Sequence, residues 1–491
     1  MKINTSGNTT KTQNYEAGES YNLSPKAELL HLTSTCLFRE PKFYGRVNLH
    51  EEKINKAIKN VASIDPEFIL KLANYLRNEQ YLRSISTYLL VSASNTLDCK
   101  KFVRQYTPKI IQRADEITEA LAMHQEIFKQ DGKKAFPNSL KKGIRDTFPK
   151  FDEYQFAKYN RKGKVTFKDA IMLTRPKEPS YIIKKILNDN LQVPYTWETE
   201  LSAKGNKPEV WEKLIDSGKL PYMATLRNLR NILESNISSE YINQVADYIS
   251  NPNNVKKSKQ LPFRFLSAHK QLQSVSSMDT TKLLDAVEIA LEESFKNITY
   301  LSGTTFIASD VSGSMSWRAI SKHSSIVPRE VGLVLSAGLH KFTERGLFGL
   351  FAENWKLVQL PKTGSILQNV SMLSNIDVGG STNGWKAIRF LNDNNIKVDR
   401  IIVFTDCQLY DIDGWGYSER SIRKELEHYK QNINPNVKTY MFDLTGYGTV
   451  NFPESDHSVA EITGWSDKTF KFIELFEKDI NAQIKYIENK F

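Results

Sequence analysis

Apolar residues recur at helical spacing, in one segment after another, from residue 26 to about residue 296. In the segment 66–77, Phe68, Leu72 and Leu76 fall on one face, and Pro66 suits the first turn of a helix. Many short amphipathic segments with few strand signals predict an α-solenoid of helical pairs. No exact sequence repeat is present, so an irregular helical domain fits the same pattern. Further helices are expected at residues 82–93, 109–129, 180–191, 208–217, 222–235, 239–250 and 280–296, and a polar loop at 253–262.

The pattern changes near residue 298, where short apolar runs begin to alternate with helical segments. Strands are expected at residues 304–309, 346–351, 400–405 and 438–443, and helices at 331–342 and 385–392. Such alternation predicts an α/β domain, a doubly wound parallel sheet with helices on both faces. The chain is therefore multidomain: a polar, flexible arm at 1–25, a helical domain at 26–297 and an α/β domain at 298–491 that ends in one amphipathic helix at 469–491.

The excess of positive over negative charge is confined to the first three-fifths of the chain. Residues 1–300 hold 46 Lys and Arg against 34 Asp and Glu, whereas residues 301–491 hold 21 against 22. This asymmetry indicates a polyanionic partner, such as nucleic acid, for the helical part alone. A basic surface that is merely solvated would have the same composition.

Several classes of protein are disfavoured by the sequence. No apolar run approaches the roughly 18 residues that a membrane span needs, and the N-terminus has no apolar core of a secretory signal. Cys36, Cys99 and Cys407 are odd in number and far apart, which argues against disulfides or zinc and predicts a reducing, cytoplasmic location. Phosphate-loop and zinc-protease motifs are absent, and no two histidines lie four residues apart, so we expect no enzymatic activity.

Polar side chains gather where the predicted strands end. Asp310, Ser312 and Ser314 follow the strand 304–309, and Asp406 follows the strand 400–405. A Gly-rich loop at 379–383 adds Thr382. Ligands of open α/β sheets bind beyond the carboxyl ends of the strands, so these groups are expected to converge. Hydroxyl and carboxylate oxygens suit Mg²⁺ better than Zn²⁺, and the five residues therefore predict a magnesium site.

This D-x-S-x-S motif, followed by a loop threonine and a second aspartate, resembles the metal-ion-dependent adhesion site of von Willebrand factor A domains. The resemblance implies that the Ser312, Ser314 and Thr382 hydroxyls approach the ion, while Asp310 and Asp406 bind it directly or through water. It also implies one open coordination position, typically filled by a carboxylate of a partner. Ser381 precedes Thr382 and is an alternative third ligand. A vestigial site that binds no ion is the other interpretation.

The helical part resembles the TROVE module of telomerase-associated, Ro and vault proteins. Similar stretches occur in order at residues 35–45, 65–77, 156–163, 196–202, 220–230 and 261–268. The WETELS and MATLRNLR segments resemble the telomerase-associated branch more than the vertebrate Ro protein. The resemblance covers about nine-tenths of the chain. It implies a closed ring of HEAT-like helical repeats, completed by the A domain. It also implies that small structured RNA binds on an outer basic surface and that single-stranded 3′ ends of misfolded RNA enter the central hole.

The densest basic stretch supplies the candidate RNA contacts. They are Lys141, Lys142, Arg145, Lys158, Arg161, Lys162, Lys164, Lys168 and Arg175, with Tyr154, Phe156, Tyr159 and Phe167 interleaved for base stacking. Phe167 stands where Ro proteins often carry histidine. Lys71, Arg77 and Arg83 are further candidates to line the ring, although Arg77 has a neighbouring carboxylate as an alternative partner. For any single lysine the alternative is a solvated helix face, and for any single aromatic residue a place in the core.

Two functions from different classes follow. The first is an RNA-binding component of a ribonucleoprotein, whose A domain closes the ring or recruits an acidic protein such as a nuclease. The second is a metal-dependent protein-interaction scaffold, or a structural particle component, in which the helices are only a support.

Overall fold

A computed structural model of the chain describes residues 11–13, 19–21, 24–34, 49–129, 135–160, 163–192, 194–260, 262–296, 300–317, 319, 325–409, 421–445, 451–452, 458–463, 473 and 482–491. Its described elements form two compact units. One unit contains α1 to α10 together with the last helix, α23 (Ala482–Lys490). The other contains the short N-terminal strands β1 (Lys11–Gln13) and β2 (Glu19–Tyr21) and everything from α11 to β8. We call them the α1–α10 unit and the sheet unit.

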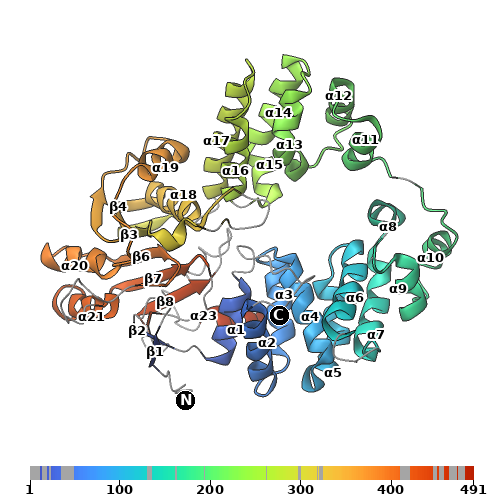
Figure 1. The fold of residues 1–491 in the computed structure, drawn as a ribbon, viewed down its shortest axis with the longest axis horizontal. Helices are drawn as coiled ribbons and strands as arrows, with labels where there is room; N and C mark the ends of the chain where they lie inside the picture. Colours follow the sequence, from blue (N-terminus) through green and yellow to red (C-terminus); the bar gives the residue numbers. More distant parts are fainter. Residues whose placement is uncertain are drawn as a thin grey trace. The chain divides into compact units, whose positions relative to one another are not determined.

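The α1–α10 unit is all helical, as the apolar periodicity predicts. Phe68, Leu72 and Leu76 are fully buried, which confirms the face predicted for the segment 66–77. The predicted helix at 109–129 is wrong at its start, since one helix ends at Ile110 and the next begins at Ala114. The helices are α1 (Pro25–Ser34), α2 (Leu49–Ala62), α3 (Phe68–Asn78), α4 (Arg83–Asn95), α5 (Lys100–Ile110), α6 (Ala114–Lys129), α7 (Asn138–Thr147), α8 (Glu153–Tyr159), α9 (Phe167–Thr174) and α10 (Ser180–Leu187) (Figure 1).

After β1 and β2, the described part of the sheet unit continues with seven helices, α11 to α17. One of them, α15, corrects the predicted loop at 253–262: Asn251 caps it by accepting hydrogen bonds from the backbone N–H groups of Asn253 and Asn254, and its Val255 is buried. The seven are α11 (Trp197–Lys204), α12 (Pro208–Asp216), α13 (Tyr222–Glu234), α14 (Ser239–Ser250), α15 (Pro252–Ser258), α16 (Pro262–Leu272) and α17 (Thr280–Phe295).

A six-stranded sheet in the order β5-β4-β3-β6-β7-β8 follows, parallel except for the edge strand β5. Its strands are β3 (Leu301–Asp310), β4 (Thr343–Phe351), β5 (Trp355–Val358), β6 (Arg400–Thr405), β7 (Lys438–Asp443) and β8 (Val459–Thr463). The helices α20 (Trp385–Asp393) and α21 (Ile422–Asn432) cover one face, while α18 (Pro328–Lys341) and α19 (Ile366–Ser374) lie on the other (Figure 1). The predicted doubly wound α/β domain is confirmed.

The α/β domain and the helices before it form one body. Near the C-terminal end of α18, Gly338 lies against the ring of Phe295, the last residue of α17: a Cβ on this glycine would come within 2.2 Å of that ring. Lys341 of α18 pairs with Glu292 of α17 at 2.7 Å. The sheet unit therefore extends to both sides of the boundary between residues 297 and 298, at which the sequence pattern changes from helical to α/β. The closed ring and the domain limits stay predictions.

In the described part of the chain no helix combines the length and apolar character needed to cross a bilayer.

Candidate functional sites at the strand tips and on the basic helices

The first candidate site is built on the adjacent ends of β3 and β6. The parallel register pairs Ser309 with Phe404, so Asp310 and Asp406 emerge side by side. Asp310 is fully buried; its carboxylate accepts hydrogen bonds from the Ser312 backbone N–H at 2.9 Å and from the Thr405 hydroxyl at 2.6 Å. The Ser312 and Ser314 hydroxyls lie 3.2 Å apart. Tight turning after the strand thus collects three oxygen-bearing side chains in one place.

The second loop closes over the first through the backbone. The N–H of Gly313 donates to the carbonyl of Gly380 at 3.1 Å, which brings the Gly-rich loop to the strand tips. Thr382 in that loop is buried, whereas Ser381 is exposed. Burial therefore favours Thr382 over its neighbour as the third hydroxyl of the site.

One of the two carboxylates of this site has an oxygen without a hydrogen-bond partner in the described residues. The Oδ1 atom of Asp406 accepts the Gln408 N–H at 3.1 Å, but within the described residues its buried Oδ2 has no hydrogen-bond partner. Burial raises the pKa of Asp310 to about 6. Burial and the Asp310 charge together raise the pKa of Asp406 to about 7. Two neighbouring acids removed from water are costly when both are ionised, and a divalent cation would remove that cost.

The donor set fits a hard cation. No three His, Cys, Asp or Glu side chains converge anywhere in the described ranges, so a metal site there depends on hydroxyl ligands. Two carboxylates with serine and threonine hydroxyls provide oxygen ligands of the kind that Mg²⁺ takes. The structure thus brings Asp310, Ser312, Ser314 and Asp406 together and places the Thr382 loop against them.

One acidic residue near this site was missed in the sequence. Asp443 ends β7, which neighbours β6, and the register sets it opposite Thr405. Its negative charge contributes to the raised pKa of Asp406. The sequence could have indicated this residue, because Asp443 is at the carboxyl end of the predicted strand 438–443, just as Asp406 follows the predicted strand 400–405.

The second candidate site is a basic surface on α5 and α7. Lys142 on α7 is exposed and Lys141 is half-buried; neither has an ion pair among the interactions resolved in the described residues. Helix α7 lies against α5, where Gly143 leaves room for Thr107. Helix α5 has exposed cations that the sequence did not single out, among them Lys101 and Arg104. We call Lys101, Arg104, Lys141, Lys142 and Arg145 the α5–α7 basic surface.

One acid is built into this surface. Asp146 accepts from Arg104 Nε at 2.5 Å and from Arg145 Nε at 3.2 Å. Burial alone would raise the pKa of Asp146, but the two guanidinium groups outweigh it and hold that pKa below its usual value. Asp146 therefore fixes the two arginines side by side while cancelling one positive charge.

The remaining predicted cations differ in how available they are. Lys164 pairs with Glu126, and Lys168 pairs with Asp189. Lys158 lies over the ring of Tyr159 at 5.6 Å, and Arg175 is exposed in a left-handed conformation at the end of α9. Arg161 and Lys162 lie outside the described residues.

The stacking hypothesis is wrong for two of its four aromatic residues. Phe156 and Phe167 are buried and pack against each other edge to face at 5.1 Å, so neither presents a face to a base. Tyr159 is covered by the guanidinium of Arg113 at 4.6 Å. Tyr154 is half-exposed and keeps the predicted role open.

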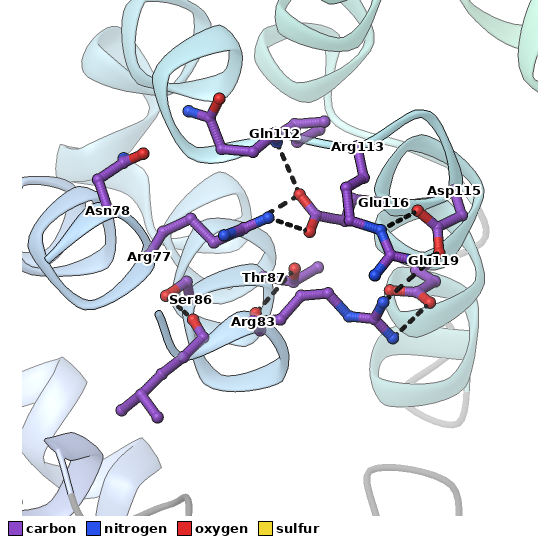
Figure 2. A network of polar contacts seen from close by, with 12 residues as sticks. Arg77, Asn78, Arg83, Ser86, Thr87, Gln112, Arg113, Asp115, Glu116 and Glu119 are labelled. Atoms are coloured by element: carbon purple, nitrogen blue, oxygen red, sulfur yellow. Dashed lines mark hydrogen bonds and ion pairs between the residues drawn. The ribbon is translucent and has the colours of Figure 1, made fainter. Parts of the chain in front are cut away.

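Arg77 and Arg83 belong to an ion-pair network (Figure 2). Arg77 of α3 binds Glu116 of α6 at 2.6 Å, and Glu116 also accepts the Gln112 backbone N–H at 2.7 Å. Arg83 reaches Glu119 at 3.0 Å. The alternative that Arg77 pairs with a carboxylate is therefore the observed one, and the network joins α3 and α4 to α6.

Comparison with known proteins adds sequence relatives and a shared fold. A model described as TROVE domain matches residues 14–190 and 189–303, and one described as Ro60 vWA domain matches residues 304–477. Telomerase protein component 1 of Mus musculus is 28% identical over 341 residues, 52% of this chain and 13% of that protein. RNA-binding protein RO60 of Caenorhabditis elegans is 24% identical over 281 residues, 55% of this chain and 42% of that protein. The chain thus spans less than half the length of these curated relatives.

A solved structure shares the fold. The crystal structure of the Deinococcus radiodurans RO (RSR) protein superposes with a TM-score of 0.61 at 16% identity, covering 93% of this chain and all of that one.

Proposed function

The chain belongs to the family that joins a TROVE domain to a Ro60 vWA domain, and from that premise we propose that it is an RNA-binding component of a ribonucleoprotein. The observation that carries the proposal is the α5–α7 basic surface, which has five cations on two packed helices, two of them paired with a single acid, Asp146. Phosphate charge supplies most of the affinity of such surfaces for nucleic acid. A relative is named as an RNA-binding protein, which supports the same partner class. The target we propose is small structured RNA, or the single-stranded ends of misfolded RNA.

Filter binding of a labelled stem-loop RNA over a range of salt concentrations tests this proposal. The double variant Lys141→Gln/Lys142→Gln should weaken binding and reduce the slope of log K against log salt by about 2, one for each lost phosphate contact. The matched control, Lys356→Gln/Lys362→Gln in the sheet unit, removes the same charge and should leave the slope unchanged. Equal losses in both variants would reduce the interaction to general charge attraction and refute the assigned surface.

We further propose that the strand-tip site holds Mg²⁺ through Asp310, Ser312, Ser314, Thr382 and Asp406. The buried Oδ2 of Asp406, which lacks a hydrogen-bond partner in the described residues, supports this assignment. When bound, the ion would supply a Lewis-acidic position for a carboxylate of an acidic protein partner, for example a nuclease. Isothermal titration with Mg²⁺ should show binding that Asp310→Ala abolishes. If Asp310→Ala leaves the heat of Mg²⁺ binding unchanged, the proposed site is refuted.

The two proposals separate by chelation. RNA binding through the α5–α7 basic surface should survive removal of divalent cations, because none of its residues belongs to the strand-tip site. If chelation abolishes RNA binding, the alternative function gains support: a metal-dependent scaffold in which the helical part has no RNA-binding role of its own. Protein capture that persists after RNase treatment but is lost in Asp310→Ala would favour the same alternative.

A further inference from the structure

Helix α23 lies far along the chain from the helices it packs on. It follows β8 of the sheet unit in sequence, yet residues 483–491 belong to the α1–α10 unit. Ile487 is fully buried there. The ring of Tyr75 on α3 meets Tyr486 edge to face at 6.3 Å and Phe491 at 5.8 Å. The last described residues are therefore part of the α1–α10 unit, although they lie hundreds of residues after its other helices in the sequence.

The polar contacts of α23 occupy two lysines. Lys26 of α1 lies 2.6 Å from the Glu488 carboxylate and also 2.6 Å from Asp65. Lys71 of α3 donates to the backbone carbonyl of Glu488. One residue of α23 thus offers a carboxylate to one lysine and a carbonyl oxygen to another. These are the kinds of acceptor that a phosphate backbone would offer to the same ammonium groups.

Helix α23 is too short to be stable by itself. It has 9 residues, and isolated helices below about 12 residues are marginal in water. Its folding is therefore coupled to docking, and the docked state depends on Ile487, the aromatic contacts and the pair between Lys490 and Glu79 at 2.9 Å. Partly exposed ion pairs of this kind are individually worth about 0–1 kcal/mol, and salt weakens them. Docking of α23 on the α1–α10 unit is therefore expected to be reversible.

We propose that α23 is an autoinhibitory strap on the α1–α10 unit, which covers a second RNA-contact surface made of Lys26, Lys71 and Tyr75. The covered surface has the composition of a single-strand site, two cations beside an aromatic ring on which a base can stack. Release of the strap adds this surface to the RNA-binding area. Asp65 stays beside Lys26 after release, so Lys71 contributes the larger share. The inference rests on the proposed RNA-binding function and goes beyond it in assigning a regulated surface.

Releasing the strap in the full-length chain tests the proposal. Ile487→Asp places a charge in the buried anchor position and should undock α23, whereas Asn489→Asp adds the same charge at an exposed position of the same helix. The probe is a fluorescent single-stranded oligouridylate, titrated over a range of salt concentrations. Ile487→Asp should bind it more tightly than the parent, with a salt slope steeper by between about 0.7 and about 1.4, for one to two added phosphate contacts. Asn489→Asp should match the parent.

Two reversals distinguish release of the strap from general unfolding. Lys26→Gln/Lys71→Gln in the Ile487→Asp background should return the slope to the parent value. A synthetic peptide of residues 482–491 should bind the Ile487→Asp protein in trans and compete with the oligouridylate. A gain that survives the lysine substitutions, or a peptide that does not compete, would overturn the strap. If the parent binds RNA but Ile487→Asp binds it no more tightly, the strap proposal is also refuted, while the proposed RNA-binding function stands. Absence of RNA binding in every variant would end both proposals.

Discussion

Loss of the Arg77 guanidinium group should destabilise the α1–α10 unit far more than loss of the Arg83 guanidinium group. Glu116 is 1% exposed, and Arg77 binds it with two guanidinium nitrogens, at 2.6 Å and 3.4 Å. In Arg77→Met, the Gln112 N–H shown in Figure 2 is the one hydrogen-bond donor that the carboxylate keeps among the described residues. A buried charge left without its partner costs about 3–5 kcal/mol.

The matched control lies in the same network. The Arg83 side chain is 36% exposed and pairs with Asp115 at 3.5 Å and with Glu119 at 3.0 Å. A solvent-screened pair of this kind contributes about 0–1 kcal/mol, so Arg83→Met should be nearly neutral. The double variant Arg77→Met/Glu116→Leu removes both buried charges and should recover most of the loss, although the Gln112 N–H then lacks its acceptor.

Native-state hydrogen exchange of the α3 and α6 amides is the appropriate measurement, because it reports the opening free energy of this unit without unfolding the sheet unit. Arg77→Met should lower that free energy by at least 2 kcal/mol more than Arg83→Met, a minimum taken from the gap between those two ranges. A loss below about 1 kcal/mol in Arg77→Met, or equal losses in the two variants, would refute the reasoning from burial.

Three further predictions concern packing and pH. Gly338→Ala should lower the free energy of unfolding by about 1–3 kcal/mol, measured by thermal denaturation, although alanine favours helices. The reason is that the new Cβ would lie 2.2 Å from the buried Phe295 ring. An unchanged stability would show that the ring moves aside. The pKa values of Asp310 and Asp406 are raised to about 6 and about 7 in the folded protein, whereas the pKa of an unfolded aspartate is 3.8. Without a bound cation, the protein should therefore lose stability as the pH rises above 3.8, because the unfolded chain releases these protons first. Mg²⁺ should therefore raise the melting temperature more at about pH 8 than at about pH 5, and an equal rise at both would contradict the proposed ligands. Burial lowers the pKa of His124 from 6.5 to about 4, so stability should fall by up to about 3 kcal/mol as pH drops through that window, and His124→Phe should flatten the dependence in acid titrations followed by circular dichroism.

Local sequence was sufficient wherever a segment's own apolar pattern decided its structure. The run 400–405 is a strand with those same ends, and every residue of it is buried. The helix predicted at 66–77 is found at 68–78, with its apolar face inside. The aspartates after the first and third parallel strands could be predicted to meet, because parallel strands present their carboxyl ends at one edge. The polar segment after residue 250 was misjudged as a loop, although Asn251 followed by proline is an N-cap signal.

Tertiary structure decided which charged and aromatic side chains are available. Lys164 and Lys168 looked equivalent to Lys141 and Lys142 in the sequence, but acids 38 and 21 residues away neutralise the first two. Phe156 and Phe167 carry no local sign that they face the core instead of solvent. Helix α23 lies more than 400 residues from Lys71 along the chain, yet its backbone accepts a hydrogen bond from that lysine. Helix and strand patterns arise from neighbours within a few positions, whereas burial and ion pairing depend on segments that meet only after the chain has folded.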